Sequence, residues 1–299
     1  MTQAIPTAVL GRTGLKVTRL GFGTAIRGNP DDEHWSEVLN SVLDSGINFI
    51  DTANDYGVNK GNPAEEQIGK HISRRRSEFY LATKCGCPAG GGEHIWTREN
   101  AFRGLHESLE RMQTDYVDVI QYHNPSVEEC EAGDLVTVLE DMRKQGKVRW
   151  IGVSTTLPHL ATFLEWGVFD VFQIPYSALE REHEEWITKS AQAGTGIVVR
   201  GGVAQGEPGA AAGEGQVNRW KLFEEAKLDE LVDGDSRTTF MLRYTLTHPH
   251  CDTTIVGTTR LDHLEENLAG VAKGPLSPDT YAEAKRRLDA AGEQAEAAA

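Results

Sequence analysis

The segment INFIDTANDYG, residues 47–57, contains the pattern on which the fold prediction rests. An apolar run of strand-forming residues ends at Asp51, and a polar loop with Tyr56 and Gly57 follows it. A run this short and apolar is typical of a strand that is buried on both faces. Its polar end either caps a turn or belongs to a functional site at the edge of a sheet. The polar residues in the rest of the chain help to decide between a turn cap and a functional site.

The same unit, a short apolar run followed by a loop and an amphipathic stretch, recurs along the chain. Eight runs fit it: TRLGFGT, INFIDTA, EFYLATK, YVDVIQYH, VRWIGVST, FDVFQIPYS, TGIVVRG and TTIVGTT. Strands that alternate with helices predict a parallel sheet. Eight units favour an α/β fold, a closed (β/α)8 TIM barrel that forms one domain over residues 1–299. The alternative, an open Rossmann sheet, needs a glycine turn after the first strand, and GFGTAIRG has Ile26 at the third glycine position.

Several amphipathic stretches carry the residues expected at helix ends. Asp31 or Asp32 can cap the first helix, Gly46 follows its last turn, and Thr97 can open the third. The glycine-rich stretch 201–216, after the seventh strand, is predicted as a long loop, either a surface loop or a mobile flap over a ligand. Residues 279–299 predict a C-terminal helix that frays at its end.

The composition restricts the partners of the chain. Its formal net charge is −15 at pH 7, and an acidic surface repels nucleic acid and anionic lipid. No apolar run approaches the roughly 20 residues of a membrane-spanning helix, and the N-terminus does not resemble a signal peptide. The four cysteines suggest reduced thiols rather than a disulfide framework. We expect a cytoplasmic protein, a monomer or small homo-oligomer, that binds a small molecule and neither nucleic acid nor membranes.

Polar residues stand at the ends of successive predicted strands. They are Asp51 with Tyr56, Lys84 in LATKCG, His123 in QYHNP, Ser154 with Thr155, and Gln173 followed by Tyr176. Each alone is more often a cap or a packed residue than a catalyst. In a barrel of this type, however, the carboxyl ends of the strands meet on the face that carries the active site. The set therefore predicts a catalytic site.

Seven segments resemble, in order and at similar spacing, the motifs of the aldo-keto reductase family. They are LGRTGLKVTRLGFGT, DTANDYG, LATKCG, DVIQYHNP, IGVSTT, FQIPYS and IVGTTRLDHLEENL. The resemblance covers nearly the whole chain and implies a barrel that binds a nicotinamide cofactor. It also implies a catalytic tetrad of Asp51, Tyr56, Lys84 and His123. The expected activity is NADPH-dependent reduction of aldehydes or ketones, or the reverse oxidation of an alcohol or sugar.

The roles of the tetrad follow from the chemistry of carbonyl reduction. Hydride transfer to carbon leaves negative charge on oxygen, which needs a proton from a positioned acid. A free tyrosine, with a pKa of about 10, is a reluctant donor at neutral pH. We expect Lys84 to lower the pKa of Tyr56 and Asp51 to hold the lysine. His123 would donate a hydrogen bond to the carbonyl oxygen.

The resemblance also implies the residues that contact the cofactor. Ser154 and Gln173 would bind the nicotinamide carboxamide, and Arg260 would take the 2′-phosphate because a guanidinium is planar and always charged. The full set of expected contacts is Thr24, Ser154, Thr155, Gln173, Tyr176, Arg200, Gly201, Gly257, Thr258, Thr259, Arg260, His263, Glu266 and Asn267.

Three positions depart from the family pattern. Thr155 stands where an asparagine usually follows the serine, which leaves one carboxamide contact open. Arg200 stands where many members have a tyrosine that stacks on the nicotinamide, so it either stacks as a cation or binds the pyrophosphate. His263 stands where an arginine often grips the 2′-phosphate. The sequence therefore favours NADPH through Arg260 and leaves NADH open.

Two aromatic loop residues, a cysteine pair and two alternative functions also belong to the prediction. His94 and Trp96 are expected either to line the substrate pocket or to pack their loop down. No metal site is predicted, since Cys85-x-Cys87 has no second cysteine pair nearby. A cofactor-binding sensor with little turnover is the first alternative function. A Schiff-base lyase with Lys84 as its nucleophile is the second.

Overall fold

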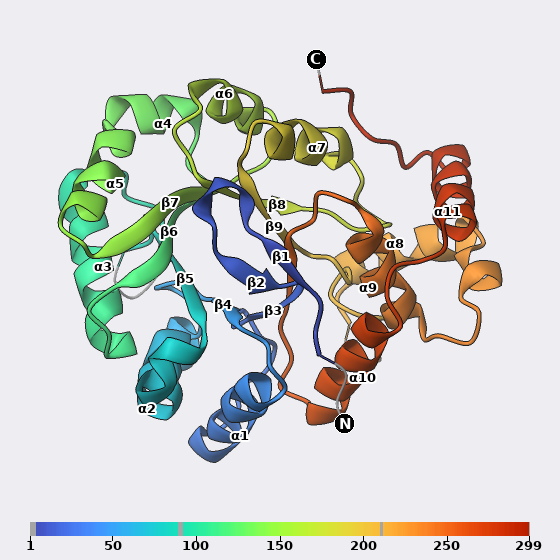
Figure 1. Cartoon of the computed structure of the whole chain (residues 1–299), viewed down its shortest axis with the longest axis horizontal. Helices are drawn as coiled ribbons and strands as arrows, with labels where there is room; N and C mark the ends of the chain where they lie inside the picture. The colour runs from blue at the N-terminus through green and yellow to red at the C-terminus, as the bar shows by residue number, and fades with distance from the viewer. Residues whose placement is uncertain (1–3, 89–91, 210–211, 299) are drawn as a thin grey trace.

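The computed structural model describes residues 4–88, 92–209 and 212–298, and in these the predicted barrel is confirmed. Eight parallel strands close in the order β10-β3-β4-β5-β6-β7-β8-β9 (Figure 1). Their bounds are β3 (Leu20–Gly23), β4 (Phe49–Asp51), β5 (Tyr80–Cys85), β6 (Val117–His123), β7 (Val148–Ser154), β8 (Val171–Pro175), β9 (Gly196–Arg200) and β10 (Thr253–Val256). Each predicted apolar run supplies one strand.

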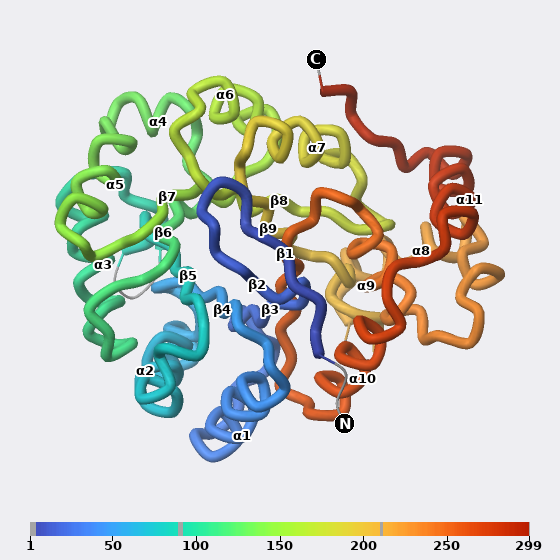
Figure 2. Tube along the Cα trace, in the orientation of Figure 1, coloured from blue at the N-terminus to red at the C-terminus, as the bar shows by residue number. Residues whose placement is uncertain are grey.

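Helices surround the barrel and bury its outer face (Figures 1 and 2). They are α1 (Asp32–Asp44), α2 (Ala64–Ile72), α3 (Arg98–Met112), α4 (Val127–Ala132), α5 (Leu135–Lys144), α6 (His159–Trp166), α7 (Glu184–Gln192), α8 (Glu214–Glu225), α9 (Arg237–Thr247), α10 (Leu261–Ala272) and α11 (Pro278–Ala290). Asp31 caps α1 by accepting from the His34 amide, and Thr97 caps α3 in the same way through Asn100. The predicted capping residues therefore cap these two helices in the structure.

The base of the barrel is closed by an N-terminal hairpin that the sequence analysis did not predict. Strands β1 (Thr7–Val9) and β2 (Lys16–Thr18) pair antiparallel and lie in front of the barrel in Figure 1. Leu10, Leu15 and Val17 are buried in one cluster with side chains from inside the barrel, such as Phe49 and Val198. This end of the barrel is therefore packed with apolar side chains.

The segments after β9 and after α11 differ from the prediction in detail. The expected loop 201–216 ends earlier, because helix α8 begins at Glu214; residues 210–211 of that stretch lie outside the described residues. Helix α11 ends at Ala290, and the tail returns to the start of α7, where the Glu296 amide donates to the Glu182 carbonyl at 3.0 Å (Figure 2). Across the described residues, no helix combines the length and apolar character needed to cross a bilayer.

Candidate active site

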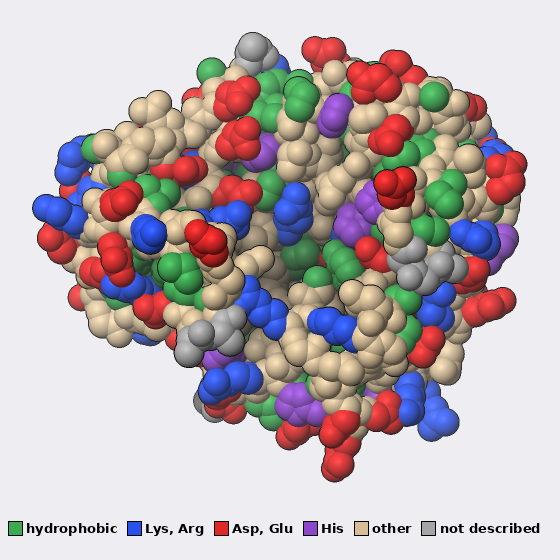
Figure 3. Space-filling model, turned by 180° about the vertical axis from the view of Figure 1, so that it is seen from behind, with side chains coloured by type: hydrophobic (Ala, Val, Ile, Leu, Met, Phe, Trp, Pro, Cys, Tyr) green, Lys and Arg blue, Asp and Glu red, His purple; other side chains and the backbone are tan. Residues whose placement is uncertain are grey.

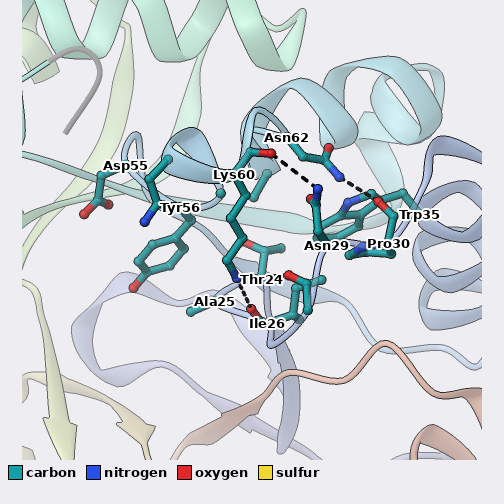
Figure 4. Close-up of a pocket in the computed structure, with 14 residues that line it drawn as sticks. Thr24, Ala25, Ile26, Asn29, Pro30, Trp35, Asp55, Tyr56, Lys60 and Asn62 are labelled. Carbon is teal, nitrogen blue, oxygen red and sulfur yellow. Dashed lines mark hydrogen bonds between the residues drawn. The ribbon is translucent and has the colours of Figure 1, made fainter.

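The carboxyl ends of the barrel strands lie on the face opposite the hairpin. The centre of this face is hollowed, and Lys and Arg side chains border the hollow (Figure 3). A pocket of about 300 Å³ lies between the loops after β3 and β4 and is lined by Thr24, Ala25, Asn29, Asp55, Tyr56 and Lys60, among others (Figure 4). The expected proton donor therefore borders a space large enough for a small molecule.

A buried ion pair lies beside this pocket. The Nζ of Lys84 at β5 donates to Oδ2 of Asp51 at the end of β4 over 2.6 Å, and also to the Thr52 carbonyl over 2.9 Å. Both side chains are almost completely buried. Burial by itself would lower the pKa of Lys84, but Asp51 and Tyr56 outweigh it, so the pKa is raised. Lys84 is therefore held as an ammonium without a free lone pair, which argues against its use as a Schiff-base nucleophile.

The second oxygen of Asp51 is bound by two amides from other strands. Gln121 on β6 donates its Nε2 to Asp51 Oδ1 at 3.1 Å, and Gln173 on β8 donates to the same oxygen at 2.8 Å. Charge-assisted hydrogen bonds of this kind stabilise a buried carboxylate. Gln173 was expected at the carboxamide; with its nitrogen bound to Asp51, its amide oxygen is the atom that can accept from a ligand. The sequence analysis missed Gln121.

Tyr56 lies directly above the ion pair. Nζ of Lys84 is 4.9 Å from the centre of the Tyr56 ring. Burial raises the pKa of Tyr56, and Lys84 offsets that rise only in part. Lys84 therefore lowers this pKa as expected, but burial outweighs its effect and the pKa lies above its ordinary value. At neutral pH Tyr56 carries its proton, and Lys84 reduces the cost of releasing it.

His123 completes the tetrad at the end of β6. Its ring lies edge-on to Tyr56, with the centroids 5.9 Å apart. Burial lowers the pKa of His123 to about 3, and the charge of Lys84 acts in the same direction. The imidazole is therefore neutral at physiological pH. Its Nδ1 faces Cys87 Sγ at 3.4 Å, which leaves Nε2 as the nitrogen for a ligand.

The residues expected around a carboxamide lie at the ends of neighbouring strands. Ser154 and Thr155 are buried at the end of β7, and the Thr155 amide donates to the Gln173 carbonyl at 3.1 Å. The Oγ of Ser154 has one long contact, 3.5 Å to Asn124 Oδ1. Thr24, at the end of β3, donates to Thr52 Oγ1 at 2.8 Å. Ser154 is thus the hydroxyl in this group with the weakest internal partner.

Arg200 ends β9, and its guanidinium is near enough to Tyr56 and Asp51 for both to raise its pKa. Burial outweighs them and lowers the pKa overall, which the nearby Glu180 carboxylate also opposes. Its Nε is buried and has no hydrogen-bond partner among the described residues. A buried donor without a partner is costly, so this atom is suited to an anionic or polar ligand. Gly201 follows it and begins the loop that leads to α8.

The loop between β10 and α10 contains the residues expected at the adenosine phosphate. A Cβ at Gly257 would lie 2.4 Å from the Gly23 carbonyl oxygen, so only glycine allows the ends of β10 and β3 to approach here. Thr258 Oγ1 accepts from the Arg260 amide at 3.0 Å. The Thr259 carbonyl is hydrogen-bonded to the His34 ring. The loop is therefore tied to α1 and to the start of α10.

Arg260 already has a partner in this structure. Its exposed guanidinium binds the Asp262 carboxylate through Nε at 3.0 Å and through NH2, and this pair lowers the pKa of Asp262 to about 2. Asp262 was not among the predicted site residues. Glu266 is bound to Ser236 and Thr239 at the start of α9. A phosphate at Arg260 would therefore have to share the guanidinium with Asp262.

The remaining expected residues of α10 and β8 differ in exposure. His263 is exposed on the first turn of α10, and Asn267 is buried one turn further along. Tyr176 is fully buried in the helical layer. Its hydroxyl bonds to that of Tyr281 at 3.0 Å, and its ring packs edge-on against His248. The structure does not bring Tyr176 into contact with the tetrad.

The loop after β5 reaches the tetrad through His94. The His94 and His123 ring centroids are 5.4 Å apart. Trp96 instead packs edge-on against Tyr122 and covers Gly86. His94 thus borders His123, whereas Trp96 holds the loop down.

Comparison with known proteins assigns the chain to a family. The model of the Aldo/keto reductase family matches residues 19–288. The chain belongs to the aldo-keto reductase family. It is therefore an oxidoreductase of a family that uses nicotinamide cofactors.

Three relatives illustrate the range of similarity. Aldo-keto reductase AKR11C1 from Bacillus halodurans, solved in its holo form, superposes with a TM-score of 0.83 at 27% identity, covering 95% of this chain and 96% of that one. The uncharacterized oxidoreductase YqkF of Bacillus subtilis is 27% identical over 87% of this chain and 89% of its own. The NADH-specific methylglyoxal reductase of Escherichia coli is 30% identical over 64% of each chain.

Proposed function

We propose that this aldo-keto reductase reduces the carbonyl group of aldehydes or ketones with a reduced nicotinamide cofactor, and that Tyr56 donates the proton. The observation that carries the proposal is the buried Lys84–Asp51 pair at 2.6 Å beneath Tyr56, beside a neutral His123. A positioned acid, a charge that stabilises its anion and a neutral hydrogen-bond donor are the groups that carbonyl reduction needs.

The residues around the tetrad fit a nicotinamide dinucleotide. The unpartnered Nε of Arg200 can donate to the pyrophosphate or lie over the nicotinamide ring. Ser154 and the amide oxygen of Gln173 would bind the carboxamide. At the other end, the amides at the start of α10, together with Thr258 and Arg260, form a site for a phosphate. The bound cofactor would supply the hydride.

The chain's own groups would then act on the substrate oxygen. His123 donates a hydrogen bond from Nε2 to the carbonyl and orients it. Tyr56 passes its phenolic proton to the oxygen as negative charge develops there, and the Lys84 ammonium stabilises the phenolate that remains. Asp51 keeps Lys84 protonated and in place. Each group acts in the protonation state that the structure gives it.

The raised pKa of Tyr56 favours one direction of reaction at neutral pH. Reduction needs the protonated phenol, which is the form present, whereas oxidation of an alcohol needs the phenolate as base. We infer that reduction is the favoured direction near neutrality. Oxidation should increase as the pH rises.

For the cofactor we propose NADPH, with Arg260 binding the 2′-phosphate. The Arg260–Asp262 pair opposes this, because the phosphate must compete with a carboxylate for the same guanidinium. The preference over NADH is therefore expected to be small, and one relative is named as NADH-specific.

The test is turnover with a panel of aldehydes and ketones, followed by the loss of reduced-nicotinamide absorbance. Tyr56→Phe should reduce kcat by roughly 10²–10⁴-fold while nucleotide binding, measured by fluorescence, is retained. Tyr80→Phe, at the opposite end of β5, is the matched control and should leave the rate unchanged. Nucleotide binding without turnover across the panel would favour the sensor function instead. Full activity of Tyr56→Phe would exclude Tyr56 as the donor.

A further inference from the structure

Three metal-binding side chains meet beside the catalytic site, from separate parts of the chain. Cys87 lies just after β5, His94 lies in the loop that follows, and His123 ends β6. Cys87 Sγ is 3.1 Å from His94 Nε2 and 3.4 Å from His123 Nδ1. One sulfur and one nitrogen from each ring all lie within 4.8 Å of one another. The three atoms therefore face a common point.

These separations are close to those around a bound ion. Zinc bonds of about 2.3 Å to sulfur and 2.0–2.1 Å to nitrogen, in tetrahedral geometry, hold sulfur and nitrogen roughly 3.5 Å apart. The contact from Cys87 to His123 already matches, and the contact from Cys87 to His94 needs to open by a few tenths of an ångström. Because His94 is on a loop, a shift of that size requires no change in the barrel.

A carboxylate from the loop after β4 lies beside this group. Asp55 Oδ1 lies 3.8 Å from His123 Nδ1. This oxygen is buried, and it has no hydrogen-bond partner among the described residues. A buried carboxylate oxygen in that state is costly unless it is paired or bound to a cation. Asp55 thus favours a positive charge next to His123.

We propose that Cys87, His94 and His123 form a binding site for a divalent zinc ion at the edge of the substrate pocket, next to the Asp55 carboxylate. One thiolate and two imidazoles are ligand types that zinc prefers, and three protein ligands leave a fourth tetrahedral position for water. Binding releases the Cys87 thiol proton to solvent. No metal was predicted from the sequence because Cys85 and Cys87 have no second cysteine pair nearby, whereas the proposed partners of Cys87 are histidines.

Occupancy of this site would act on the catalytic histidine without using its substrate-facing nitrogen. Zinc on Nδ1 of His123 leaves the ring proton on Nε2, the nitrogen assigned to the carbonyl. The metal would therefore fix the tautomer that donates a hydrogen bond. It would also add one net positive charge near Tyr56, because the Cys87 thiolate offsets part of the charge of zinc. The ion and the carbonyl are expected to influence each other's binding.

The test uses cobalt(II) as a spectroscopic substitute for zinc in the purified full-length protein. We expect a thiolate-to-cobalt charge-transfer band in the near ultraviolet and intense visible bands of tetrahedral cobalt, both removed by added zinc. Cys87→Ala should lose the charge-transfer band. Its affinity for zinc should fall by more than the roughly 10–100-fold loss that is typical when a residue hydrogen-bonded to a metal ligand is removed. Cys85→Ala is the matched control, because Cys85 is buried in the helix–barrel core two residues away.

Two further measurements keep the result independent of folding and turnover. Thermal unfolding of both cysteine variants shows whether each is folded before metal is added. His94→Ala should weaken zinc binding and keep the charge-transfer band, since the thiolate remains. Weak octahedral cobalt spectra, or equal zinc affinity in Cys87→Ala and Cys85→Ala, would overturn the proposal, and neither result bears on carbonyl reduction.

Discussion

The buried pair of Asp51 and Lys84 allows a quantitative test of how the site is held together. Asp51→Asn keeps the shape of the side chain and removes the charge that accepts from Lys84 at 2.6 Å, Gln173 at 2.8 Å and Gln121 at 3.1 Å. Removing one partner of a buried pair leaves the other charge uncompensated and costs about 3–5 kcal/mol. We expect the free energy of unfolding, measured in urea at neutral pH, to fall by that amount.

The double variant separates the charge from the packing. Lys84→Met alone should also destabilise the protein, because it leaves the Asp51 charge buried. In Asp51→Asn with Lys84→Met neither charge remains, and replacing a whole buried pair is often close to neutral. The double variant should therefore be more stable than Asp51→Asn, and still inactive because the ammonium beneath Tyr56 is missing. If the two losses simply add, the pair is not coupled and the reasoning is wrong.

The pH dependence of this stabilisation has a defined sign. The pKa of Lys84 is raised in the folded protein, so its contribution is fully present below the unfolded-state value of about 10.4. It is lost only as the pH rises through the higher folded value. Wild type and the double variant should therefore keep a constant stability difference across the neutral range.

Three other outcomes are expected. Because the pKa of His123 is about 3, kcat/KM for reduction should show no His123 transition near pH 6.5; a transition there that disappears in His123→Gln would contradict this. Asp262→Asn should release Arg260 and increase the preference for NADPH over NADH, measured as the ratio of kcat/KM values, by only a few-fold, since an exposed ion pair is weak; an unchanged ratio would remove Arg260 from the phosphate site. Gly11→Ala, whose Cβ would lie 2.1 Å from the Gly196 nitrogen, should lower the thermal midpoint far more than Gly14→Ala, which meets open space at a similar positive φ; equal effects would exclude the close approach as the cause.

The barrel could be predicted from the sequence because its strands are buried on both faces and end in polar residues. Asp51, Lys84 and His123 each follow an apolar run, and parallel strands carry such ends to one face whatever the loops do. The hairpin β1–β2 has strands of only three residues, too short for a periodic pattern. Helix α4 was missed although its capping box, Ser126 with Glu129, is visible in the sequence.

The details of the site depended on information that a one-dimensional pattern does not contain. Tyr176 follows a strand that is buried throughout, so the sequence does not say which side of the barrel wall its ring faces. The pKa of Tyr56 depends on a balance between burial and Lys84, and only the structure gives the degree of burial. The partners of Cys87 come from a loop and from another strand, and loop conformation has no periodic signal.

The hydrogen bond from Gln173 to Asp51 crosses the interior of the barrel, because β8 and β4 stand opposite each other in the ring of strands. With Lys84 and Gln121 it joins four of the eight strands at one carboxylate. The Asp51–Lys84 pair is therefore anchored to the wall of the barrel independently of the loops above it. Loops can lengthen, shorten or change sequence, and so admit new substrates, while this buried carboxylate and ammonium keep their positions.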